Sequence, residues 1–335
     1  MTKLLLNLIV ASALTGGSAS AALAQAAPAS TASQAAQAPR KVSPVRGAAQ
    51  AGLVTVETVD LSPRFLDFYA AAQGKTPDAR FAEWRARYGF AAAPPTPAGQ
   101  AVARKLVDAA WDRYPAALPR IRGGMGRLTA AAAPMIARVA EVLRLERPAK
   151  LKLVGYVGGF EDNAFTAPEP GGVVALSLPL ESSPEFVALV VPHEATHAVH
   201  AVIAGLSPGY ERTLARVILE EGLAMHVAKV VAPGKPDAAY TERLPGWHRA
   251  TRARLPDILR GLRPALRSSS PDDLMRFTMG EGAAGFEREA YAAGWAVVGR
   301  LLADGMTPAD IARVPEADMP ALVERTTGRL LTSTE

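Results

Sequence analysis

Hydrophobic residues recur along most of the chain at the three- and four-residue spacing of amphipathic helices. Phe65, Phe68 and Tyr69 show this spacing in its most N-terminal stretch. Three short segments break the pattern. Val54-Thr55-Val56 predicts the start of a short strand, and consecutive aliphatic and β-branched residues at 151–156 and 173–178 predict two further strands. The predicted helices cover about 62–88, 98–113, 127–145, 184–204, 212–230 and 289–302. Helices, then a small sheet, then more helices predict an α+β fold that is α-rich.

The first fifty residues differ from the rest. Lys3, an apolar run over residues 4–14 and the small residues Ala22 and Ala24 have the order of a secretory signal peptide, with cleavage predicted before Gln25. The residues that follow are mostly Ala, Gln, Pro and Ser, which is typical of a flexible linker. The predicted organisation is a signal peptide at 1–24, a disordered linker at 25–52, a helical N-terminal part at 53–148 and a catalytic part at 149–335.

Composition removes several function classes. The 335-residue chain has no cysteine, so disulfides, thiol nucleophiles, cysteine-ligated metals and a lipoprotein anchor are excluded. The net charge of +5 is carried mainly by scattered arginines, and no basic run supports nucleic-acid binding. We expect an exported protein, periplasmic or extracellular, that has no membrane segment after signal cleavage. The oligomeric state stays open.

The segment from His193 to His197 reads H-E-x-x-H. On a helix, residues four apart lie one above the other, so two imidazoles at this spacing can bind one zinc ion. Glu194 would lie beside the open coordination position and could take a proton from metal-bound water. Ser182 and Glu185 form a predicted capping box for this helix, and Pro192 is expected to kink it.

A third ligand is expected on the next helix, which contains Glu220 and Glu221. Glu220 has Arg216 four residues before it, which predicts a surface ion pair. Glu221 lies on an apolar stripe, where a carboxylate needs a cationic partner. Gly222 is small and would let this helix approach the H-E-x-x-H helix closely. The pattern favours Glu221 as the ligand.

His193-Glu-x-x-His197 followed by Glu221-Gly-Leu-Ala resembles the gluzincin peptidases, in particular bacterial families of zinc-dependent proteases with H-E-x-x-H and a later E-G-L-A. The resemblance covers about 150–300. It implies a zincin-like fold, one zinc ion per chain bound by the two histidines and Glu221, and Glu194 as the general base. A metallopeptidase acting on a peptide or protein substrate is the expected function. The alternatives are an inactive zincin scaffold, a non-enzymatic periplasmic zinc protein, or a zinc amidase acting on a cell-wall substrate.

Further residues are candidates for the surroundings of the metal. His200, two helical turns after His193, is a candidate for contacting the ligands or the substrate pocket, or else a hydrogen-bonded core histidine. Asn163, Ala164 and Phe165 resemble the edge strand on which thermolysin-like enzymes bind a peptide. The alternative is a loop, because the stretch 158–172 is rich in loop-forming residues.

Hydrolysis also needs a donor to stabilise the developing oxyanion. Tyr291 is the first candidate and His226 and His248 follow it. A core aromatic residue is the alternative for Tyr291. The glycine-rich stretch 280–285 follows no strand, which argues against a phosphate-binding loop and leaves a mobile flap as a further interpretation.

Overall fold

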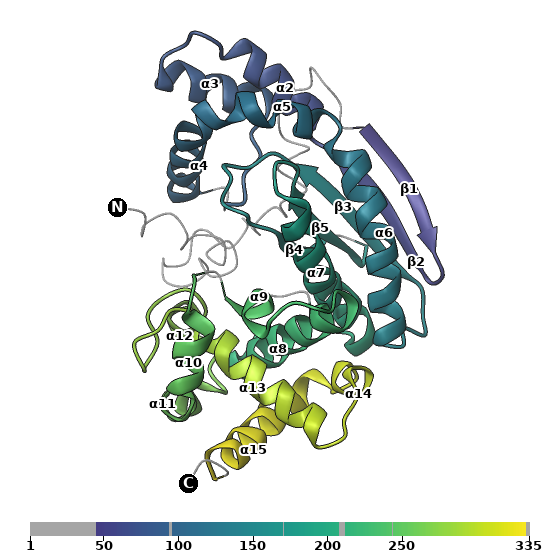
Figure 1. Ribbon diagram of the computed structural model, residues 1–335, viewed down its shortest axis with the longest axis vertical. Helices are drawn as coiled ribbons and strands as arrows, with labels where there is room; N and C mark the ends of the chain where they lie inside the picture. Colours follow the sequence, from purple (N-terminus) through teal and green to yellow (C-terminus); the bar gives the residue numbers. More distant parts are fainter. Residues whose placement is uncertain (1–44, 94–95, 170, 208–211, 243, 333–335) are drawn as a thin grey trace, which may run out of the picture. The chain divides into compact units, whose positions relative to one another are not determined.

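The structure is a computed structural model that describes residues 45–93, 96–169, 171–207, 212–242 and 244–332 (Figure 1). These residues form two compact units. The first contains 45–134 and 148–188, and the second contains 135–147 and 189–332. The predicted signal peptide and most of the predicted linker lie outside the described residues. The expected boundary near 148 does not separate the two units, because strands after this point pair with strands before it.

The first unit is built on a five-stranded mixed sheet with the order β1-β2-β3-β5-β4. The strands are β1 (Val45–Ala51), β2 (Val54–Asp60), β3 (Ala149–Tyr156), β4 (Phe165–Glu169) and β5 (Val173–Pro179). The central pairs β2–β3 and β3–β5 are parallel, whereas the two edge strands are antiparallel to their neighbours. The predicted strands near 54, 151 and 173 are confirmed.

Two strands lie where the sequence predicts none. β1 lies inside the expected linker, and its backbone pairs with β2 over its whole length. Its residues show no alternation of apolar and polar positions, so the signal for a strand comes from the neighbour and not from its own sequence. β4 lies inside the stretch 158–172, for which loop is the expectation. It forms an edge of the sheet, where a strand needs only one pairing partner.

Four helices that lie wholly in the first unit precede β3. They are α2 (Ser62–Ala71), α3 (Pro77–Arg87), α4 (Pro97–Ala110) and α5 (Tyr114–Arg122), with a short 3₁₀ turn η2 (Trp111–Arg113). Their apolar faces meet in an aromatic cluster, in which Phe65 contacts the rings of Tyr88 and Tyr114 edge to face. Gly74, with a φ of 68°, lies in the break between α2 and α3, which divides the predicted helix 62–88 in two.

The described part of the second unit contains helices and no strands. α6 (Gly124–Val142) and α7 (Pro184–Ala204) begin in the first unit and end in the second. The helices that follow are α8 (Leu214–Val231), α9 (Asp237–Thr241), α10 (Trp247–Ala253), α11 (Leu255–Leu262), α12 (Pro271–Thr278), α13 (Glu289–Ala303), α14 (Pro308–Ala312) and α15 (Met319–Thr332). Two 3₁₀ turns, η3 (Arg263–Ala265) and η4 (Glu316–Asp318), complete the unit. The α+β, helix-rich class is confirmed.

α7 is the most apolar long helix of the described chain. By length and composition it meets the criteria of a membrane span, which core helices of soluble proteins also meet. Its C-terminal half is largely buried, including Val191, Ala195 and Val199. α7 also contains the H-E-x-x-H motif, so its burial bears directly on the site.

Candidate metal centre

The helix that contains H-E-x-x-H forms where the sequence predicts it, with a different cap. The hydroxyl of Ser183 accepts a hydrogen bond from the backbone N–H of Phe186 at 3.1 Å, so Ser183 is the N-cap. The hydroxyl of Ser182, the predicted cap, bonds Asp162 at 2.9 Å instead. Proline at the first helical position moves the cap to the residue directly before it. The helix continues through Pro192 to Ala204.

α8 supplies the third candidate ligand and is almost completely buried. Its N-terminus is capped by Thr213, whose hydroxyl accepts a hydrogen bond from the N–H of Arg216. Gly222 follows Glu221 and lies against α13. A Cβ atom at Gly222 would lie 2.2 Å from the carbonyl oxygen of Gly294. The close approach predicted from Gly222 therefore exists, but its partner is α13 and not the H-E-x-x-H helix.

Three atoms from α7 and α8 converge. Nε2 of His193 lies 3.2 Å from Nε2 of His197 and 3.2 Å from Oε2 of Glu221, and Nε2 of His197 lies 3.5 Å from Oε2 of Glu221. A tetrahedral metal ion with bonds of about 2.0–2.1 Å holds its ligands about 3.3–3.4 Å apart. The three separations between the His193, His197 and Glu221 atoms, 3.2, 3.2 and 3.5 Å, agree with this value. His193, His197 and Glu221 therefore form a largely buried group that could hold a metal ion.

The charges around these atoms also favour a cation. Burial alone would lower the pKa of His197, but the Glu221 carboxylate outweighs it and, with Glu194 and Glu220, raises the pKa to about 9. Burial would raise the pKa of Glu221, yet the charge of His197 and the contact with both rings lower it well below its ordinary value. Oε2 of Glu221 accepts no well-directed hydrogen bond from any described residue. A bound cation would satisfy this buried oxygen.

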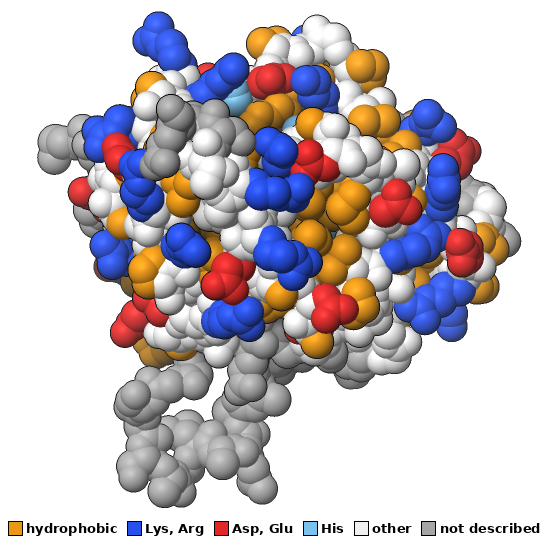
Figure 2. All heavy atoms as spheres, turned by 90° about the horizontal axis from the view of Figure 1, so that it is seen from below, with side chains coloured by type: hydrophobic (Ala, Val, Ile, Leu, Met, Phe, Trp, Pro, Cys, Tyr) orange, Lys and Arg blue, Asp and Glu red, His pale blue; other side chains and the backbone are white. Residues whose placement is uncertain are grey.

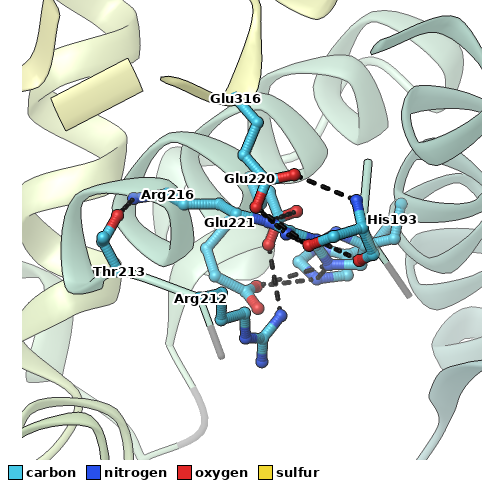
Figure 3. A network of polar contacts seen from close by, with 9 residues as sticks. His193, Arg212, Thr213, Arg216, Glu220, Glu221 and Glu316 are labelled. Atoms are coloured by element: carbon cyan, nitrogen blue, oxygen red, sulfur yellow. Dashed lines mark hydrogen bonds and ion pairs between the residues drawn. The ribbon is translucent and has the colours of Figure 1, made fainter. Parts of the chain in front are cut away.

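Glu220 forms the second buried charge cluster of α8, shown in Figure 3. Its two oxygens accept hydrogen bonds from Arg216 at 2.8 Å and from Arg212 at 3.1 Å. Arg216 also donates to Glu316 and Ser207. The predicted Arg216–Glu220 pair is confirmed, but it is buried and not on the surface. The cluster ties α8 to Ser207 in the segment after α7 and to η4, which restrains the rotation of α8 next to Glu221.

His200 is 1% exposed and is not a member of the ligand group. Its Nε2 atom has no hydrogen-bond partner among the described residues. Burial lowers the pKa of His200 to about 4, against the opposing charge of Glu220. His200 is therefore neutral near pH 7. The interpretation as a hydrogen-bonded core histidine does not hold for Nε2, and a role beside the ligands stays a prediction.

The candidate oxyanion donors have neighbours of their own. The ring of His226 stacks on Trp295 with centroids 4.0 Å apart, and its Nε2 donates to the Trp295 carbonyl oxygen at 2.9 Å. His248 contacts the hydroxyl of Thr241 through Nδ1. Tyr291 is partly buried on α13, with the guanidinium of Arg288 3.7 Å from its ring centroid. The catalytic role of Tyr291 stays a prediction.

Asn163 and Ala164 belong to the first unit and lie directly before β4. The Asn163 side chain is buried, and its Nδ2 atom has no hydrogen-bond partner among the described residues. The backbone oxygen of Asn163 accepts a hydrogen bond from the Tyr156 hydroxyl. β4 is an edge strand, as the resemblance to a peptide-binding strand implies, whereas substrate contact by Asn163 and Ala164 stays a prediction.

Glu289 is a buried residue that no sequence motif singles out. Its carboxylate accepts hydrogen bonds from the backbone N–H groups of Ala283, Ala284 and Phe286 at 2.7–3.2 Å. A Cβ at Gly282 would lie 2.2 Å from Cδ of Glu289, so glycine is needed there. The glycine-rich stretch 280–285 is therefore bound around a carboxylate, which argues against the mobile flap. The one feature of the sequence that could have indicated this contact is a glutamate at the start of a predicted helix.

Comparison with protein-family models and curated sequences identifies no relative of this chain. The chain matches no protein-family model and no curated protein sequence. The resemblance to the gluzincins therefore rests on the two short motifs and on the way α7 and α8 bring them together.

Proposed function

We propose that His193, His197 and Glu221 bind one zinc ion per chain. Two imidazoles and one carboxylate are an established ligand set for catalytic zinc, which has three protein ligands and one open position. Structural zinc sites usually have four protein ligands, and no fourth His, Asp or Glu joins this group among the described residues. The absence of cysteine removes the main competing ligand type.

We further propose that the protein is a zincin-like metallopeptidase. When bound, zinc supplies a Lewis acid that makes a water molecule acidic near neutral pH and polarises the substrate carbonyl. Glu194 follows His193 directly on α7, is 8% exposed, and contributes to the raised pKa of His197. Its carboxylate is suited to take the proton from the attacking water and to pass it to the leaving amine.

The observation that carries the proposal is the His193–His197–Glu221 triangle with a buried glutamate next to His193. The test is hydrolysis of labelled casein and of a quenched peptide library by zinc-loaded protein. Glu194→Gln should lower hydrolysis at least about 100-fold and leave the zinc content unchanged. Glu185→Gln, an exposed glutamate in the first turn of the same helix, is the matched control. Full hydrolysis by Glu194→Gln would contradict the proposed role.

The N-terminal residues support export as part of this proposal. Lys3, the apolar run after it and the Ala22-Leu23-Ala24 sequence favour cleavage by a signal peptidase. Mass spectrometry of the protein from the periplasm or the culture medium should give Gln25 as the first residue. A full-length chain that stays in the cytoplasm would contradict export without affecting the proposed metal site.

A further inference from the structure

A groove of about 1090 Å³ lies in the second unit, between α11, the C-terminal end of α13 and α15. Its lining combines two kinds of side chain. The basic residues are Arg260, Arg263, Arg325 and Arg329. The aliphatic residues are Leu301, Met306, Leu322 and Leu331. No residue of the candidate metal centre lines this groove.

The positive charge of the groove is only partly neutralised. Asp304 is the one acidic residue in its lining, and it pairs with Arg300 at 2.9 Å and Arg329 at 2.7 Å. Arg263 and Arg325 are exposed, and within the described chain no carboxylate lies within ion-pairing distance of either. Two guanidinium groups at the groove are therefore available to an external anion.

The segment that supplies Arg260 and Arg263 of the groove is rich in arginine. Residues 247–270, which include α10, α11 and η3, contain six arginines and one aspartate. Ile258, Leu259 and Leu262 of this segment are buried, so its arginines remain on the outside. Figure 2 shows the molecule from the end that contains α11 and α15 in Figure 1, where basic side chains lie beside exposed hydrophobic ones, with acidic side chains between them.

We propose that this groove is a docking site for an acidic amphipathic peptide segment of a partner protein. Guanidinium groups bind carboxylates through paired hydrogen bonds, which accounts for the acidic residues. The aliphatic side chains of the lining account for the hydrophobic residues of the peptide, as when an amphipathic helix binds in a groove. At about 1090 Å³ the groove is slightly larger than the usual range of about 300–1000 Å³ for small-molecule sites, so it suits a peptide.

The experiment is fluorescence anisotropy with the full mature protein and a short fluorescein-labelled peptide that carries glutamate and leucine at helical spacing. We expect saturable binding that weakens with salt. Arg263→Gln/Arg325→Gln should weaken it about tenfold, and Leu331→Ser should weaken it with no change of net charge. Arg249→Gln/Arg252→Gln removes the same charge from exposed residues outside the groove and should leave the Kd unchanged.

Several results would overturn the proposal. Equal weakening by Arg249→Gln/Arg252→Gln would mean general electrostatic attraction. Binding of a glutamine version of the peptide with the same affinity would remove the role of the arginines. Absence of peptide binding together with sedimentation on phosphatidylglycerol vesicles would assign the surface to anionic lipid. Hydrolysis by the zinc-loaded protein is measured separately, so failure here leaves the proposed metallopeptidase function intact.

Discussion

Gly222→Ala tests the contact that holds α8, and with it Glu221, against α13. The new methyl group would lie 2.2 Å from the Gly294 carbonyl oxygen, so this distance must widen by about 1.2 Å to reach an ordinary 3.4 Å contact. The Gly294 carbonyl oxygen belongs to the backbone of α13 and cannot rotate away as a side chain could, so the two helices have to move apart. Overpacking of this kind costs about 3 kcal/mol, and the higher helix propensity of alanine returns about 1 kcal/mol. We expect a net loss of about 2 kcal/mol.

The assay is urea unfolding of the metal-free protein, followed by tryptophan fluorescence and circular dichroism. Gly328→Ala is the matched control, because Gly328 is also helical and a Cβ atom added there would meet no atom within 4 Å beyond its own stretch of helix. It should stabilise by about 0.5–1 kcal/mol. Gly222→Ala should also weaken zinc binding, because Glu221 moves with α8. An unchanged or raised free energy of unfolding for Gly222→Ala would refute the reasoning.

Three further substitutions have definite expected results. Glu289→Gln should lower the free energy of unfolding by at least about 2 kcal/mol, because three backbone N–H groups lose an anionic acceptor. The control is Glu287→Gln at an exposed residue, and an equal loss of stability in both variants would contradict the role of Glu289. Burial and the charge of Glu161 raise the pKa of Glu181 from 4.5 to about 8, so the folded protein holds a proton there that the unfolded chain has released. The free energy of unfolding of the wild type should therefore fall as the pH rises from about 4.5 to 8, and in Glu181→Gln this fall should be smaller by a few kcal/mol. Identical pH profiles of the free energy of unfolding for the two proteins would refute this expectation. Glu220→Gln should lower the free energy of unfolding by about 2–3 kcal/mol, because among the described residues buried Arg216 then keeps only Glu316 as a charged partner. Glu324→Gln, at a much more accessible ion pair, should cost less than about 1 kcal/mol, and thermal unfolding measures both variants.

The candidate metal ligands could be predicted because their signals are local. Four-residue spacing on one helix brings His193 and His197 together without any knowledge of the rest of the fold. Glu221 is separable from Glu220 by the apolar stripe it lies on, and the structure brings it within 3.5 Å of both imidazoles. The exposure predicted for Glu220 is wrong, because α8 is buried from Leu214 to Met225 and the arginine partner of Glu220 is buried with it.

The features that the sequence does not reveal depend on distant parts of the chain. β1 is a strand because β2 offers it a free edge, which its own composition does not show. The carboxylate of Glu289 binds backbone N–H groups of the preceding loop, and such a contact has no sequence pattern. Gly222 predicts a close helix contact correctly but not its partner, since any helix with a facing glycine can approach it, and Gly294 of α13 does so.

Zinc stoichiometry tests the central claim most directly. Mature protein is loaded with zinc and dialysed, and its zinc content per chain is measured by inductively coupled plasma mass spectrometry. Variants of the three proposed ligands are measured alongside, with a His226 variant as the control histidine. We predict one zinc ion per wild-type and His226→Ala chain, and loss of tight binding in His193→Ala, His197→Ala and Glu221→Ala. A wild-type protein that binds no zinc, or a Glu221→Ala variant that binds it as tightly as the wild type, would contradict the proposed metal centre.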